Sequence, residues 1–112
     1  MNSTMNHQLD PREKLLTLTI PGDILSTNAD GLREEIFGVL ESPAIKNAEW
    51  NTLKLDLKAA QMVDSVGLNL IVALIRAVQQ RQVKIQTVIS SSNIQRTFLF
   101  TRLDKQMEII KV

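Results

Sequence analysis

Leu53–Lys58 has the sequence LKLDLK, and Asp64–Leu68, a few residues further on, has the sequence DSVGL. Leucine alternates with charged residues in the first stretch, which is typical of a strand that is buried on one side. Residues 63–80 are predominantly apolar and are long enough for a helix rather than a strand. A strand that leads directly into such a helix predicts a crossover unit, in which the helix packs against the sheet.

The rest of the chain alternates between the same two patterns. Upstream, a strand is expected over residues 16–20 and an amphipathic helix over residues 28–41. Downstream we expect a β-branched strand (83–89), a short helix that contains Ile94 and Phe98, and a last strand (107–112). The turn residues at Asp10-Pro11 leave two alternatives for residues 1–13, namely a flexible segment or an N-terminal hairpin strand. The expected fold is therefore α/β, with helices packed on a mixed sheet of four or five strands.

Composition argues against several classes of function. The 112 residues are enough for one domain, and 13 basic against 12 acidic residues give no excess charge for binding nucleic acid. Cysteine is absent, and the single histidine, His7, is expected in an N-terminal tail. We therefore expect no enzyme activity, no cofactor and no metal site. Because no segment has the pattern of a signal peptide or a membrane span, we expect a soluble cytoplasmic protein that does not insert into membranes.

The predicted central helix is more apolar than packing on a sheet requires. Its polar residues Asn69, Arg76 and Gln80 occupy an arc of only about 40°, and Gln79 lies apart from them. A helix that lies on a sheet needs an apolar stripe of about 100°. Two explanations stay open: neighbouring helices bury this helix on three sides, or part of its apolar surface contacts a protein partner.

Asp64 and Ser65, at the start of the same helix, are both favourable N-cap residues, and capping alone would account for them. A serine that acts as a nucleophile needs a base, and the only histidine is expected in the tail. If Ser65 has a chemical role, it is more consistent with a residue that another protein modifies.

Asp64–Leu68 resembles the DSxGL segment of the STAS domain family, in particular that of the bacterial anti-sigma factor antagonists. Three further segments resemble family segments in the expected order: Ile20–Asp23 (IPGD), Leu53–Leu57 (LKLDL) and Phe98–Asp104 (FLFTRLD). The resemblance covers nearly the whole chain and implies a STAS-like fold, with residues 1–112 as a single STAS domain.

Two positions depart from the family pattern. Arg102 stands where the family often has glycine, which concerns the end of the last helix. Leu25 stands where many members have an aspartate, in the loop beside the DSVGL segment. Neither departure affects Ser65 itself.

The resemblance implies that the chain is an anti-sigma factor antagonist in a partner-switching system. The unphosphorylated form would bind an anti-sigma factor that is a serine kinase with a histidine-kinase-like ATPase fold. Phosphorylation of Ser65 would abolish this binding, and a metal-dependent serine phosphatase would restore it. A helix start suits such a modification, because free backbone N–H groups there are expected to accommodate a phosphate.

The partner surface is expected at one end of the sheet, where three loops meet. The residues that we expect to contribute are Asp23, Ser26, Asp64, Ser65, Asn69, Ser90, Ser91 and Ser92. Turn formation and helix capping are ordinary alternatives for Asp23 and for the three consecutive serines. For the whole chain, the alternative function is a STAS subunit that is not phosphorylated and docks in a transporter, lipid-transport or stressosome-like assembly.

Overall fold

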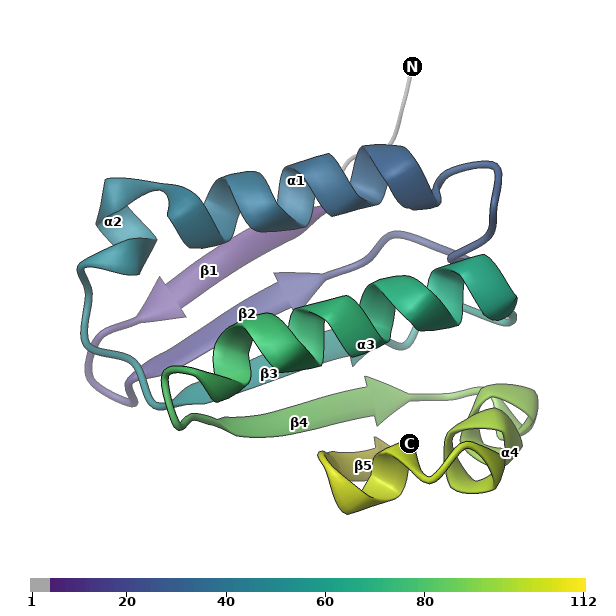
Figure 1. The fold of residues 1–112 in the computed structure, drawn as a ribbon. Helices are drawn as coiled ribbons and strands as arrows, with labels where there is room; N and C mark the ends of the chain where they lie inside the picture. The colour runs from purple at the N-terminus through teal and green to yellow at the C-terminus, as the bar shows by residue number, and fades with distance from the viewer. Residues whose placement is uncertain (1–4) are drawn as a thin grey trace.

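The computed structural model describes residues 5–112, which form a five-stranded sheet with helices α1 and α3 lying over one of its faces (Figure 1). The elements follow the chain in the order β1 (Asn6–Asp10), β2 (Leu15–Thr19), α1 (Ala29–Glu41), α2 (Pro43–Lys46), β3 (Thr52–Leu57), α3 (Ser65–Gln79), β4 (Lys84–Ile89), α4 (Ser92–Phe100), the 3-10 helix η1 (Leu103–Lys105) and β5 (Glu108–Lys111). This arrangement confirms the predicted α/β fold and its mixed sheet.

The strands lie in the sheet in the order in which they occur in the sequence. β1 is antiparallel to β2, whereas β2, β3, β4 and β5 run parallel to one another. Each parallel connection passes through at least one helix, as a crossover requires. Because the parallel strands point in one direction, the loops that follow β2, β3 and β4 come together at the same end of the sheet.

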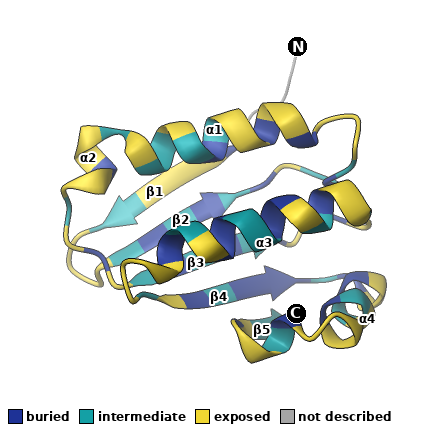
Figure 2. Cartoon of the chain, viewed as in Figure 1, coloured by how far each residue is buried: buried dark blue, intermediate teal, exposed yellow. Residues whose placement is uncertain are grey.

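The core lies between the sheet and the helices. Leu53, Leu55 and Leu57 of β3 are fully buried, whereas Lys54 and Asp56 alternate with them on the opposite face. In Figure 2 the buried residues follow β2, β3, β4 and the side of α3 that meets the sheet. The alternation of leucine and charge therefore sets which face of the sheet the helices cover.

The N-terminal segment forms a strand. β1 pairs with β2, and the Asp10 carboxylate accepts hydrogen bonds from the N–H groups of Arg12 and Glu13 in the turn between them. The hairpin alternative is thus confirmed for residues 6–10, while residues 1–4 lie outside the described part. The placement of His7 in a tail was wrong, because the Asp10 turn folds this segment onto the sheet and pairs His7 with Leu18.

A short helix follows α1 that the sequence patterns did not predict. α2 begins with Pro43, a residue favoured at the first helical position, and it buries Ile45. The Ile45 carbonyl accepts a hydrogen bond of 3.0 Å from the Trp50 indole N–H. The guanidinium of Arg81 lies 4.1 Å from the centre of the Trp50 ring and donates to two backbone carbonyls after Ile45. This cluster fixes the connection from α1 to β3.

Arg102, which replaces the glycine that the family often has, adopts the left-handed conformation that glycine favours. Its backbone angles are φ 64° and ψ 24°, directly before η1. An L-residue in this region is strained by about 1–2 kcal/mol. Arg102 thus holds a backbone conformation that glycine would adopt without strain.

We expect Arg102→Gly to raise the free energy of unfolding by about 0.5 kcal/mol, because relief of the strain exceeds the extra entropy that glycine has in the unfolded chain. Urea denaturation measures the change. The control Arg96→Gly, inside α4, should instead lower the free energy by about 1 kcal/mol. A destabilising Arg102→Gly would contradict this account of the turn.

Candidate functional site

The site is built from two segments: loop 23–28, which follows β2, and segment 61–67, which leads into α3. Ile24 N–H donates to the Met62 carbonyl, and Asp64 N–H donates to the Ile24 carbonyl, both over 3.2 Å. Ile24 and Val63 form an isolated parallel bridge. Loop 23–28 and segment 61–67 therefore continue the pairing of β2 and β3 beyond the ends of these strands.

Asp64 is the N-cap of α3, and its carboxylate also reaches across to the neighbouring loop. Oδ1 accepts from the Gly67 N–H over 2.8 Å, and Oδ2 accepts from the Ser26 N–H over 2.7 Å. The N–H groups of Gly67 and, next, of Ser26 hold the pKa of Asp64 below its usual value of 3.8. The carboxylate is therefore ionised at neutral pH.

Asp23 makes the reciprocal contact. Its Oδ1 accepts from the N–H groups of Gln61 and Met62 over 2.7 and 3.1 Å. Asn28 is the N-cap residue of α1, but its side chain makes no cap bond. It accepts instead from the Leu25 N–H and donates to the Asp23 carbonyl within the loop. Both aspartates thus bind backbone N–H groups. Within residues 5–112 no group of three or more histidine or acidic side chains is placed to hold a metal ion.

Gly67 is required by the close approach of the two segments. A Cβ atom at this position would lie 2.2 Å from the Ile24 carbonyl oxygen, far inside the van der Waals distance. The backbone angles of Gly67 are those of an ordinary helix, so the space alone demands glycine. This gives the glycine of the DSVGL segment a packing role that the sequence did not reveal.

Ser65 is the first residue of α3 and is exposed. Among residues 5–112, no hydrogen bond to its hydroxyl is found within ordinary distances. Two apolar neighbours are also exposed, Met62 by 56% and Val66 by 42%, and Asn69 lies one helical turn further along. The start of α3 thus combines a free hydroxyl with exposed apolar side chains. Val66 is the only large apolar residue of α3 that is exposed, because the rest of the helix's apolar surface is buried or half-buried in the fold.

The expectation that the helix start offers free N–H groups to a phosphate was wrong for the Gly67 N–H, because the Asp64 carboxylate already occupies it. The helix dipole favours one anion at this place, and Asp64 supplies that anion. The Gly67 N–H is therefore not free to bind a group added to the Ser65 hydroxyl.

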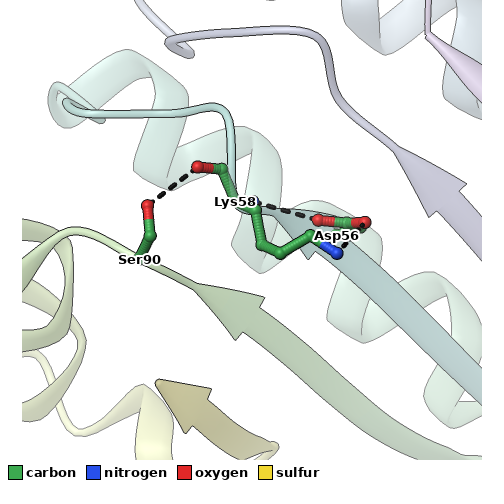
Figure 3. A network of polar contacts seen from close by, with 3 residues as sticks. All are labelled: Asp56, Lys58 and Ser90. Atoms are coloured by element: carbon green, nitrogen blue, oxygen red, sulfur yellow. Dashed lines mark hydrogen bonds and ion pairs between the residues drawn. The ribbon is translucent and has the colours of Figure 1, made fainter. Parts of the chain in front are cut away.

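The serines after β4 have separate roles in the structure. Ser90 donates its hydroxyl to the Lys58 carbonyl over 2.8 Å and so ties β4 to the loop after β3 (Figure 3). Lys58 in turn contacts Asp56 twice, through its N–H and through its ammonium group, which lies 3.4 Å from the carboxylate. These contacts hold the ends of β3 and β4 together.

Ser91 is the N-cap of α4. Its hydroxyl accepts from Ile94 N–H, donates to the Gln61 carbonyl and is part of a residue that is only 6% exposed. Ser92, the next residue, is exposed. Ser91 therefore fits its alternative interpretation as a cap and has little surface left for a partner, whereas Ser92 remains available.

The described chain is thus a mixed α/β sheet with an exposed serine at the start of its central crossover helix. The STAS domain model matches residues 6–112, and the chain belongs to the STAS domain family. This confirms the resemblance of the DSVGL segment and of the segments around it. Among curated proteins, no sequence match was found.

Solved structures share this fold. A candidate anti-sigma factor antagonist from Thermotoga maritima matches with a TM-score of 0.79 and 18% identity, over 96% of this chain and 86% of that one. An anti-sigma factor antagonist from Mycobacterium paratuberculosis gives 0.69 and 18%, over 97% and 87%. The anti-sigma factor antagonist SpoIIAA in its unphosphorylated form gives 0.68 and 13%, over 97% and 89%. At these identities the likeness establishes the fold.

We expect Gly67→Ala to lower the free energy of unfolding by about 1–3 kcal/mol, because the new methyl group would displace the Ile24 carbonyl. The matched control is Gly31→Ala in α1, where a Cβ atom meets nothing within 4 Å. This control should stabilise the chain by up to about 1 kcal/mol. Thermal or urea denaturation measures both, and equal effects of the two substitutions would contradict the close-approach explanation.

The lowered pKa of Asp64 predicts that the free energy of unfolding depends on pH. Its pKa is lower in the folded chain than in the unfolded chain, so its contribution is complete above the unfolded value of 3.8 and disappears as the pH falls through the folded value. The difference in free energy of unfolding between wild type and Asp64→Asn should therefore shrink below about pH 4. Urea denaturation over an acidic pH series measures it, and a difference that stays constant would contradict the anchoring of this carboxylate.

Proposed function

We propose that this chain is an anti-sigma factor antagonist whose binding is switched by phosphorylation of Ser65. Membership of the STAS family and the fold shared with anti-sigma factor antagonists support this function. Among the similar structures is SpoIIAA in a phosphorylated form, with 16% identity and a TM-score of 0.67, over 96% of this chain and 92% of that one. The observation that carries the proposal is the exposed Ser65 hydroxyl at the start of a firmly anchored helix.

The proposed switch acts through charge. A phosphoryl group adds about −1.5 to −2 charges at neutral pH. It would stand beside the ionised Asp64 and between the exposed side chains of Met62 and Val66, which the unmodified surface offers to a partner. Desolvation and like-charge repulsion of a few kcal/mol weaken binding by about a hundredfold or more. Folding of the chain need not change.

The proposed partners supply the chemistry. The partner that is released is an anti-sigma factor with a histidine-kinase-like ATPase fold, which transfers the γ-phosphoryl group of ATP to the Ser65 oxygen and leaves ADP. A metal-dependent serine phosphatase returns the hydroxyl by hydrolysis. The chain itself would act as substrate and ligand, without enzyme activity or a cofactor.

The proposed contact surface contains fewer residues than the sequence suggested. Asp23 and Asp64 hold it in place through backbone N–H groups, Ser90 uses its hydroxyl for the Lys58 carbonyl, and Ser91 is buried. The residues that we propose for contact are Ser26, Met62, Ser65, Val66, Asn69 and Ser92, all of them exposed.

The proposal also covers the extent and location of the domain. We propose that residues 1–112 act as one STAS domain and that it works in the cytoplasm, where its kinase would find ATP. No helix within residues 5–112 has the length and apolar character needed to cross a membrane.

A docking subunit that is not phosphorylated is the second candidate, and one surface favours it. Phe100, at the end of α4, is 90% exposed, and its neighbour Leu99 is 52% exposed. With Arg96 and Thr97 they line a groove on this helix. An exposed aromatic ring beside an apolar groove is typical of a protein contact. On this second reading, α4 rather than Ser65 would carry the interaction.

We expect a serine kinase of the proposed anti-sigma factor class to transfer phosphate from ATP to Ser65, as mass spectrometry of the product would show. Ser65→Ala should abolish the transfer and keep tight binding, and Ser65→Asp should weaken binding to the kinase, because it places a charge in the contact surface. Calorimetry measures the dissociation constants. The control Ser92→Ala removes another exposed serine and should leave phosphorylation intact.

The two candidates give different results in this experiment. If Ser65 takes no phosphate and both Ser65 variants bind the kinase as the wild type does, the phosphorylation switch is wrong. Binding of the wild type that is lost in Phe100→Ser, without phosphorylation, would favour the docking subunit.

A further inference from the structure

We propose that Asp64 is a positioning residue that makes loop 23–28 and the start of α3 a single recognition surface for the partner that modifies Ser65. The inference rests on the proposed function, whose contact surface already includes Ser26, and adds to it the coupling that holds this loop and Ser65 together. The partner would contact loop 23–28 together with Ser65, and Asp64 would keep the two in register.

The first observation is that loop 23–28 and segment 61–67 each contribute one carboxylate that binds backbone N–H groups of the other. Asp64, in segment 61–67, holds the N–H of Ser26 over 2.7 Å. Asp23, in loop 23–28, holds the N–H groups of Gln61 and Met62 over 2.7 and 3.1 Å. Each segment thus supplies an anion to the backbone of the other, and charge-assisted bonds of this kind are stronger than neutral ones.

The second observation is that the backbones of loop 23–28 and segment 61–67 are in close contact. The Ile24 carbonyl accepts from Asp64 N–H and at the same time packs against Cα of Gly67, where even a methyl group would not fit. Asn28 closes loop 23–28 internally through its bonds to Leu25 and Asp23. Motion of one segment therefore has to break contacts of the other, so we expect them to open together.

The third observation is which groups face outward. Ser26, Thr27 and Asn28 are exposed in loop 23–28, and Ser65 is exposed beside the residue that holds this loop. Ser65 belongs to the first turn of α3, which the bond from the Gly67 N–H to Asp64 Oδ1 caps, so loss of the Ser26 bond alone leaves Ser65 at the helix start. Loss of the Asp64–Ser26 bond would therefore change what the partner can contact around Ser65, and it would affect binding more than the transfer of phosphate.

Amide hydrogen exchange tests the coupling on the chain alone. Asn at position 64 keeps one side-chain oxygen for the Gly67 N–H but has no second acceptor for Ser26, so Asp64→Asn retains the cap. This variant should accelerate exchange at Ser26 by about tenfold, the equivalent of one hydrogen bond. It should also accelerate exchange at Gln61 and Met62, which Asp64 does not touch.

Substitution of the other carboxylate, Asp23, completes the test. Asp23→Ala should accelerate exchange at Ser26, which Asp23 does not contact, whereas Asp30→Ala, an exposed aspartate in the first turn of α1, should leave Ser26, Gln61 and Met62 unchanged. If each substitution affects only the N–H groups that its own carboxylate holds, the two segments are independent and the inference is overturned.

Phosphorylation kinetics then test recognition. With the kinase, Asp64→Asn should raise the KM for this chain by about tenfold and leave kcat within about twofold, because binding is impaired while Ser65 stays in place. A role limited to stability would change neither constant well below the melting temperature. Unchanged KM with normal phosphorylation of the wild type would overturn this inference and leave the proposed function standing. Absence of phosphate on wild-type Ser65 would refute the proposed function, and the recognition role with it.

Discussion

The site depends on the Asp64 carboxylate, which joins the first turn of α3 to the loop after β2. The first turn of any helix has N–H groups without partners inside the helix. The loop beside the start of α3 also has backbone groups that are not paired with a strand. One carboxylate satisfies a group of each kind. It reaches both because Gly67 lets the Ile24 carbonyl approach the helix backbone. The exposed serine that follows Asp64 is consequently held on a rigid support.

Local patterns were sufficient to predict the fold. The alternation of leucine with charge in β3 determines which side chains enter the core, and the long apolar run of α3 needs a sheet to cover it. Even the N-terminal hairpin was indicated by the turn residues at Asp10-Pro11. These features depend on residues close in sequence, where spacing and turn chemistry determine structure directly. The family segments added the order of elements around Ser65, which the structure confirms.

The contacts that organise the site are of another kind. The bond between Asp64 and Ser26 joins residues 38 positions apart, and so does the bond between Asp23 and Gln61. Neither is visible in a pattern of hydrophobicity, because both depend on how closely two loops approach after folding. Arg102 shows the same limit, since its sequence departs from the family while its backbone adopts the left-handed turn. Sequence therefore located the candidate serine, and tertiary distances explain how it is held.

Occupation of the helix start by Asp64 also explains why the proposed modification would act outward. If the N–H groups of the first turn were free, a phosphoryl group on Ser65 would fold back onto them and lose much of its effect on a partner. The Asp64 carboxylate binds the Gly67 N–H, so a phosphoryl group on Ser65 could bind this N–H only by displacing the neighbouring carboxylate. The added charge is therefore more stable in solvent, in front of the apolar side chains of Met62 and Val66. If Ser65 is phosphorylated as proposed, the anchored aspartate beside it would thus make the added charge weaken the complex with the partner while the fold stays unchanged.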